Sequence, residues 1–448
     1  MEKTGFGLSQ PHKLSADELA ALAGLGSPLI SALGAWLARS LSCAHCKRCT
    51  RRCEVLEQAD LDIGLVEAAF ARFSALEGDA LNEAVLDSIQ EHPELYHALR
   101  RCCFCGHCTA SCATHMTAAE RMREWRQPLA SAGLIPTEGS KLVMVDNEWH
   151  IFSAYRAIHD ISYPEFIALD AASGTGVDTV FFPGCSLASY APELLRHIGH
   201  WLDEAGYRWA LSIDCCGSPL MSAGLFERSE ALRLRLLEQM RAAGIGRILT
   251  VCPGCGEELA AIMGDEMDIV PLPELLLEQP PSHARESASP LSLTFFDSCH
   301  DRFNLRHGRA VRQLLRRCHP DAPQREMEHF GKDTLCCGAG GAVATYDAEI
   351  TKNRVWRIID EAQATGADRL VTTCPTCSYT IAQALLTAEA EQEASGAKGA
   401  AGAKPSLLGR NYLELVFDVS IDWPAVFGRL EAMWTGEYGP WLTQTFFQ

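Results

Sequence analysis

The residues of this chain with the most distinctive chemistry are its 20 cysteines. Eight of them form two copies of the spacing C-x2-C-x2-C-x3-C. In this spacing three thiolates of one tight loop hold one [4Fe–4S] cube, and the fourth cysteine reaches the other cube. The spacing therefore predicts two cubane clusters. One set of ligands is Cys43, Cys46, Cys49 and Cys112, and the other is Cys102, Cys105, Cys108 and Cys53.

Ten further cysteines follow a second pattern, which occurs twice: one cysteine, then C-C-G, then C-x-x-C. The first copy comprises Cys185, Cys215, Cys216, Gly217, Cys252 and Cys255, and the second comprises Cys299, Cys336, Cys337, Gly338, Cys374 and Cys377. Five thiols form a soft-ligand pocket, which suits an iron–sulfur cluster or zinc but not a hard cation. The glycines Gly217 and Gly338 let the backbone approach an inorganic core, where amide N–H groups can bond to sulfur.

The two remaining cysteines, Cys103 and Cys318, fall outside every ligand interval; we expect Cys103 to be a packing thiol and Cys318 to be a packing or surface residue. Disulfides are not expected, because a disulfide scaffold with this many cysteines is normally a short secreted chain. This chain is long, shows no secretory signal and groups its thiols as a metal site would. We therefore expect a reducing compartment, the cytoplasm.

Residues 1–172 are expected to form one domain around the first eight cysteines. The interval between Cys53 and Cys102 has apolar residues at helical spacing. One such face is Leu65, Ala69, Phe73 and Leu76, and another is Leu81, Val85, Ile89, Leu95 and Leu99, the latter interrupted at His92-Pro93. A further helix is expected over Met116–Leu134. This piece resembles the α-helical ferredoxin domain rather than the small β-rich bacterial ferredoxin.

The rest of the chain is an internal repeat, expected to form domains at 173–288 and 289–448. Arg247–Cys255 matches Arg369–Cys377 at a constant offset in the sequence. In each copy a strand-like run leads into the first cysteine, and strands alternate with helical segments, which argues for an α/β domain with a mostly parallel sheet. Ligands of such sheets collect beyond the carboxyl ends of the strands, where the cysteines lie.

Two segments of the second copy need separate explanations. The Ala-, Gly-, Glu- and Lys-rich run at 389–404 is interpreted as a flexible surface insertion rather than a functional lid. The C-terminal tail is rich in aromatic residues, which we expect in the core or in oligomer contacts. Docking to a membrane surface or a partner is the alternative.

Charge and hydropathy exclude two classes of partner. The formal net charge of −18 argues against nucleic acid, because phosphate binding needs a basic face. The most apolar stretch, Leu19–Leu41, contains Pro28, Gly34 and Arg39, so it predicts a buried helix pair rather than a transmembrane segment. Basic residues nevertheless gather near the first eight cysteines, as a solvated rim or a dock for an acidic partner: Lys47, Arg48, Arg51, Arg52, Arg100 and Arg101.

The doubled pattern resembles the CCG domain family. With two ferredoxin motifs in front of it, the chain looks like a fused heterodisulfide reductase catalytic subunit. It is also similar to the iron–sulfur subunits of glycolate oxidase and anaerobic glycerol-3-phosphate dehydrogenase. The resemblance implies a multidomain chain: an α-helical ferredoxin domain followed by two α/β CCG domains. It also implies a non-cubane [4Fe–4S] cluster in each five-cysteine set, with zinc as the alternative in one of them.

Few other groups could take part in chemistry. His300, directly after Cys299, could give a proton to a departing thiolate or a reduced quinone. The alternative is that it bonds a cluster sulfur or the backbone. No G-x-G-x-x-G follows a strand, so no nucleotide site is expected and electrons must come from another subunit, a flavoprotein.

We therefore expect an oxidoreductase subunit that passes electrons through two ferredoxin clusters and two CCG-bound clusters to a terminal acceptor, a disulfide or quinone. The alternatives are a non-catalytic relay between two redox proteins and a zinc-stabilised interaction protein.

Overall fold

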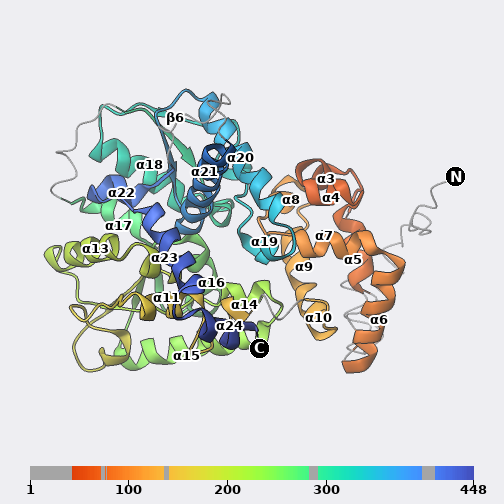
Figure 1. The fold of residues 1–448 in the computed structure, drawn as a ribbon, viewed down its shortest axis with the longest axis horizontal. Helices are drawn as coiled ribbons and strands as arrows, with labels where there is room; N and C mark the ends of the chain where they lie inside the picture. Colours follow the sequence, from red (N-terminus) through yellow and green to blue (C-terminus); the bar gives the residue numbers. More distant parts are fainter. Residues whose placement is uncertain are drawn as a thin grey trace, which may run out of the picture. The chain divides into compact units, whose positions relative to one another are not determined.

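The computed structural model describes residues 43–71, 76, 78–135, 141–281, 291–395 and 409–447. Its contacts divide the chain into two units, Met1–Ile135 and Pro136–Gln448 (Figure 1). The apolar stretch Leu19–Leu41 lies outside the described residues, as does Phe73. Within the described parts of the chain, no helix is both long and apolar enough to cross a membrane.

The first unit consists of helices and loops over its described residues. The helices are α3 (Arg48–Arg52), α4 (Glu54–Gln58), α5 (Ile63–Ala71), α6 (Gly78–Glu91), α7 (Pro93–Arg101), α8 (His107–Ser111), α9 (Ala118–Glu124) and α10 (Arg126–Ser131). Pro93 begins α7 at the expected break, since proline is tolerated in the first helical turn. Val85, Leu95 and Leu99 are buried, as their spacing predicts. The expected helix Met116–Leu134 is two helices, α9 and α10, which meet at Trp125.

The first copy of the repeat is built on a four-stranded parallel sheet in the order β2-β1-β3-β4. Its strands are β1 (Thr179–Phe182), β2 (Trp209–Leu211), β3 (Arg247–Thr250) and β4 (Asp268–Pro271). The helices between and after them are α12 (Cys185–Tyr190), α13 (Pro192–Glu204), α14 (Ser218–Ser222), α15 (Phe226–Ala243), α16 (Pro253–Met263) and α17 (Leu272–Glu278). The parallel sheet is confirmed.

The second copy repeats this topology, with a parallel sheet in the order β6-β5-β7-β8. Its strands are β5 (Leu293–Phe296), β6 (Gln324–Arg325), β7 (Arg369–Thr372) and β8 (Arg410–Asn411). The associated helices are η4 (Cys299–Asp301), α18 (Arg306–Cys318), η5 (Gly331–Asp333), η6 (Gly340–Ala342), α19 (Val343–Tyr346), α20 (Ala348–Ala364), α21 (Pro375–Ser395) and α22 (Tyr412–Phe417).

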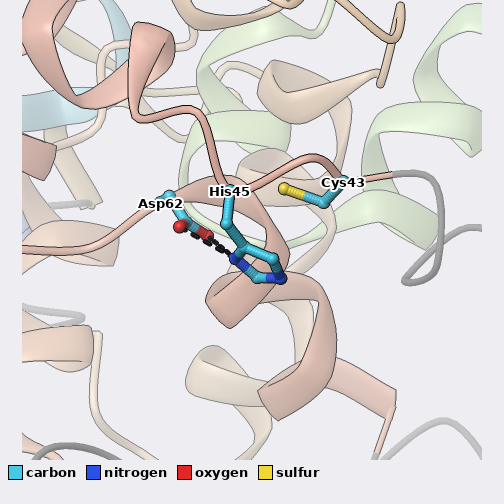
Figure 2. Close-up of side chains that lie close together, drawn as sticks. All are labelled: Cys43, His45 and Asp62. Atoms are coloured by element: carbon cyan, nitrogen blue, oxygen red, sulfur yellow. Dashed lines mark hydrogen bonds and ion pairs between the residues drawn. The ribbon is translucent and has the colours of Figure 1, made fainter. Parts of the chain in front are cut away.

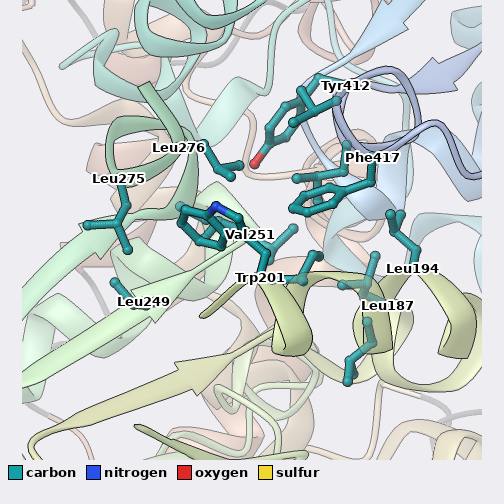
Figure 3. Close-up of a cluster of buried hydrophobic side chains, with 14 of the residues drawn as sticks. Leu187, Leu194, Trp201, Leu249, Val251, Leu275, Leu276, Tyr412 and Phe417 are labelled. Atoms are coloured by element: carbon teal, nitrogen blue, oxygen red, sulfur yellow. The ribbon is translucent and has the colours of Figure 1, made fainter. Parts of the chain in front are cut away.

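The two copies pack on each other through equivalent pairs of helices. α13 of the first copy contacts α22 of the second, and α18 of the second contacts α17 of the first. These are equivalent pairs, because α13 and α18 each follow the first cysteine of their copy. Between them lies one shared core that includes Leu249, Leu275, Tyr412 and Phe417 (Figure 3). The copies therefore form one body, and this fixes the distance between their cysteine loops.

The segment before the first sheet belongs to this second unit, which places the division at Ile135 rather than at the expected residue 172. It contains η1 (Lys141–Val143), α11 (Ile151–Ile158) and η2 (Leu169–Ala171). Val145 and Leu169 are buried in the core of the first sheet, and Tyr155 is buried against the C-terminal helices. Apolar burial of this kind ties the segment to the repeat.

Those C-terminal helices are α23 (Trp423–Thr435) and α24 (Gly439–Phe447). Trp441 packs edge-on against Trp149 with ring centroids 5.1 Å apart, and Phe446 is buried. Aromatic residues of the tail thus contribute to a core, as one of the two interpretations predicts. The expected flexible run at 389–404 is helical as far as Ser395, because α21 continues that far, and the rest lies outside the described residues.

Candidate functional site

The cysteine loops of both copies follow the carboxyl ends of the strands. Cys185 follows β1 and opens α12, and Cys252 follows β3 and caps α16. Gly184 between β1 and Cys185 has φ 80°, a left-handed conformation that favours glycine. A Cβ at Gly184 would lie 3.2 Å from the Cys255 sulfur. The glycine is therefore what allows the first cysteine loop to approach the C-x-x-C loop.

The two C-C-G glycines are required by the backbone in the same way. Gly217 has φ 84° and Gly338 has φ 81°, and a Cβ at either would collide with the following long helix, at Ser229 or Thr351. The Gly338 amide donates a hydrogen bond to the Cys336 sulfur at 3.4 Å. This is the amide-to-sulfur geometry that the sequence predicts beside the ligands.

The thiols of the two copies form a nearly continuous chain of neighbours. In the first copy hydrogen bonds link Cys185 to Cys215, Cys215 to Cys216 and Cys216 to Cys255. In the second copy the sulfurs of Cys337 and Cys377 are 3.4 Å apart.

This row of neighbouring thiols passes from the first copy to the second at the first cysteine of each C-x-x-C. The sulfur of Cys252 lies 3.9 Å from that of Cys374. The two five-cysteine sets thus meet and do not form two isolated pockets.

The electrostatics of these thiols favour the binding of metal ions. Thiol neighbours and then burial raise the pKa of Cys255 and Cys377 well above the usual range, since two thiolates side by side repel each other. Iron or zinc relieves that repulsion by sharing the charge. The soft donors, their burial and the glycine-opened backbone fit the iron–sulfur group that the sequence implies, and the same donors also fit zinc.

His300 lies at one edge of this site, between the two copies; we call this edge, with His300 and Glu257, one mouth of the site. It follows Cys299 of the second copy, and its Nδ1 contacts a carboxylate oxygen of Glu257 from the first copy at 2.5 Å. The ring covers Gly254, where a Cβ would come 3.1 Å from the His300 Cδ2 atom. Thiol hydrogen bonds lower the pKa of Cys216 and Cys374, and the charge of His300 lowers both further. His300 therefore acts on thiols of both copies.

The internal symmetry produces a second mouth that is chemically different. Tyr379 occupies the position equivalent to Glu257, and it stacks on Tyr190 with ring centroids 5.3 Å apart. Trp423 and Phe427 of α23 pack against Tyr379 in turn. A small cavity at this place is lined almost only by apolar atoms. Aromatic rings thus cover this mouth, whereas the side chain of Glu257 is half exposed at the other.

The eight ferredoxin-type cysteines all lie in the first unit, on two short loops with left-handed turns. Lys47 precedes α3 with φ 55° and Gly106 precedes α8 with φ 73°. α3 and α8 contact each other, which brings the loops together. Burial raises the pKa of Cys108, and repulsion by Cys53, Cys102 and Cys49 raises it further. Cys53 and Cys49 of the first loop are thus both neighbours of Cys108, and ligation of the second cluster by Cys53 stays a prediction.

The pKa of Cys112 behaves in the opposite way. Burial alone would raise it, but the Thr114 hydroxyl and the Met116 amide, each 3.4 Å from the sulfur, contribute to an overall lowering. A lowered pKa favours the thiolate, the form that binds metal. Cys103 and Cys318 are buried, and their role as packing thiols stays a prediction.

Some charged residues at these sites were not predicted from the sequence. Asp62 is buried beside the first loop, where it accepts a hydrogen bond from His45 (Figure 2). Arg126 is fully buried beside the second loop. Glu257 is a third example. His45 could have been noticed because it stands between two ligands, but Asp62 and Arg126 approach the cysteines only through folding.

Two segments of the chain, residues 179–260 and 293–382, match the model of the cysteine-rich domain called CCG. The chain is also 23% identical to an uncharacterized iron–sulfur protein of Methanococcus maripaludis over 77% of this chain and 67% of the relative.

Two further relatives have functional names. One is a subunit of a fumarate reductase (CoM/CoB) from Methanothermobacter marburgensis, which is 23% identical over 77% of this chain and 68% of the relative. The other is a subunit of a dihydromethanophenazine:CoB–CoM heterodisulfide reductase from Methanosarcina mazei, which is 23% identical over 62% of this chain and 70% of its own length. The two matched segments contain three strands of each sheet and all five cysteines of each copy, so this chain contains two copies of the CCG cysteine-rich domain.

Proposed function

We propose that this protein is the iron–sulfur subunit of an oxidoreductase complex. It passes electrons between a flavoprotein partner and a terminal acceptor, a disulfide or quinone, as in heterodisulfide reductase. The observation that carries the proposal is the meeting of two five-cysteine sets at Cys252 and Cys374, 3.9 Å apart. Relatives named as reductase subunits support it.

The protein's own residues have separate roles in this proposal. The ferredoxin-type loops hold two cubane clusters, which supply one-electron transfer. The two CCG sets hold two further clusters. Their ligands come from three loops each, so these sets can leave room for an acceptor, whereas a cube with four cysteine ligands is saturated.

The acceptor approaches at the mouth that carries His300 and Glu257. Aromatic rings close the equivalent mouth, where Tyr190 stacks on Tyr379. His300, when both of its ring nitrogens carry hydrogen, supplies the Nε2 proton to the reduced acceptor, and the Glu257 carboxylate, which can only accept, holds the hydrogen on Nδ1. Nε2 is thus the ring nitrogen available to the acceptor.

Metal analysis and turnover together test this function. Anaerobically prepared protein with four [4Fe–4S] clusters holds about 16 iron atoms, which follows from the cluster formula. Near-stoichiometric zinc with half that iron would instead favour a zinc-stabilised interaction protein. Turnover of a disulfide or quinone with an artificial electron donor separates catalysis from a relay, since a relay transfers electrons only to another redox protein.

A further inference from the structure

The two ferredoxin-type loops have buried side chains of opposite charge beside them. Next to the first loop, Asp62 is 3% exposed. Its carboxylate accepts a hydrogen bond from the His45 Nδ1 at 3.0 Å (Figure 2). It accepts another from the Leu65 amide at 3.1 Å. An Asp62 oxygen, a His45 ring nitrogen and the Cys43 sulfur all lie within 4.8 Å of one another. A buried negative charge therefore lies close to a ligand of the first cluster.

Next to the second loop the buried charge is positive. Arg126 is 0% exposed. Its Nη2 donates hydrogen bonds to the carbonyl oxygens of Cys102 at 3.2 Å and Arg100 at 3.0 Å. Its guanidinium carbon lies 5.0 Å from the ring centroid of Phe104, which has φ 56° and stands between two ligands of the loop. Arg126 thus both positions the second loop and places its charge beside it.

The exposed basic residues of the first loop do not reverse this difference. In the first loop Arg51 donates to the Cys46 carbonyl at 3.0 Å, but Arg51 is exposed, and water screens its charge. Lys47 is exposed as well and pairs with Asp60. Backbone amides point at sulfurs of both clusters, at Cys43 and Cys112 of the first and at Cys108 of the second; as neutral dipoles they act more weakly than a full buried charge.

We propose that Asp62 and Arg126 set unequal reduction potentials for the two clusters. An electron that enters the first unit resides on the cluster held by Cys102, Cys105, Cys108 and Cys53. Reduction adds one negative charge to a cluster; a buried cation stabilises that charge and a buried anion opposes it. The step moves one electron from the reduced cluster to the oxidised one, and no bond forms or breaks. This inference rests on the cluster assignment of the proposed function.

The test is an anaerobic reductive titration of the full chain with dithionite, followed by electron paramagnetic resonance. Cys46→Ser identifies the signals of the first-loop cluster. In the wild type the second-loop cluster should be reduced first. Arg126→Gln and Asp62→Asn, which remove charge at nearly constant size, should each shift the partition of the electron between the clusters by about tenfold, or about 59 mV for a one-electron couple.

The controls separate charge from packing. Arg126→Lys keeps the charge and should restore the wild-type partition, whereas a purely structural role would make Lys and Gln alike. Exposed Arg48→Gln should leave the partition nearly unchanged. If Arg126→Gln fails to fold, Asp62→Asn tests the opposite cluster independently. The inference would be overturned if Arg126→Gln and Asp62→Asn both left the partition unchanged. It would also be overturned if the cluster of the Cys43 loop were reduced first in the wild type. Lack of ferredoxin-type iron would instead overturn the proposed function.

Discussion

Cys252 and Cys374 occupy equivalent positions 122 residues apart in the two CCG domains, and their sulfurs lie 3.9 Å from each other. This contact lies where the two copies meet, between equivalent positions of the repeat. α12 contacts α21 on one side of it, and α16 contacts η4 on the other. The two sides carry different side chains, so a symmetric scaffold has produced an asymmetric site, with ionisable groups at one mouth and aromatic rings at the other.

The two mouths give a matched pair of substitutions. Since His300 is the proposed proton donor, His300→Gln should lower kcat for the acceptor by about 100-fold, as removal of a general acid commonly does. Glu257→Gln should lower it less, because it removes only the group that orients the ring. Tyr379→Phe, at the position equivalent to Glu257, is the control and should leave kcat nearly unchanged. If Tyr379→Phe lowered kcat as much as His300→Gln does, with the iron content unchanged in both variants, the assignment would be contradicted.

The CCG ligands can be separated from the cysteines that only pack. Cys337→Ser removes a thiol whose sulfur lies 3.4 Å from that of Cys377, so it should abolish turnover of the terminal acceptor. The two ferredoxin-type clusters should still be reduced by the partner, because their ligands lie in the other unit.

Two substitutions outside the ligand sets are the controls for this experiment. Cys103→Ser and Cys318→Ser alter buried cysteines that belong to neither group, and both should keep wild-type iron content and turnover. If Cys337→Ser turned over normally while Cys105→Ser alone stopped catalysis, the CCG sites would be structural.

The pattern of cysteines was enough to predict much of this molecule. Spacing alone separates the ferredoxin-type cysteines from the CCG cysteines, and the repeat of Arg247–Cys255 at Arg369–Cys377 predicts two parallel sheets with cysteines at their carboxyl ends. These features are local in sequence: each strand runs directly into its ligand loop, so periodicity and turn residues identify them.

What the sequence did not reveal depends on long-range packing. Glu257 and His300 belong to different copies and meet only because the copies share a core. Asp62 and Arg126 approach the cysteine loops through helices that follow those loops. The boundary at Ile135 has the same origin, because Tyr155 is buried against helices that come almost 300 residues later. No local pattern encodes such contacts.

The basic rim of the first unit can be tested as a docking surface. Arg48 and Arg52 are exposed, and they are preferable to Arg51, which bonds the Cys46 carbonyl. The double reversal Arg48→Glu and Arg52→Glu should slow electron entry from an acidic partner and weaken its dependence on salt. Exposed Arg235→Glu in the second unit is the charge-matched control. If the double variant accepts electrons at the wild-type rate at low ionic strength, the rim is only solvated surface.

The stability of the second unit should depend on pH through His150, which caps α11. Burial lowers the pKa of His150 to about 4, because the charged imidazolium is poorly solvated there. In the unfolded chain the pKa of a histidine is near 6.5, so acidification protonates the unfolded state first. The stabilisation is therefore complete above about pH 6.5 and is lost as the pH falls towards 4, by up to about 3 kcal/mol.

His150→Asn isolates this contribution, because asparagine also caps helices but does not titrate. Anaerobic thermal unfolding, followed by circular dichroism at about pH 7.5 and about pH 5, should show a smaller loss of Tm in the variant than in the wild type. Part of the acid loss should remain, because burial also lowers the pKa of His307 to about 4. If wild type and variant lose the same Tm over this range, His150 is not the group that couples folding of this unit to pH.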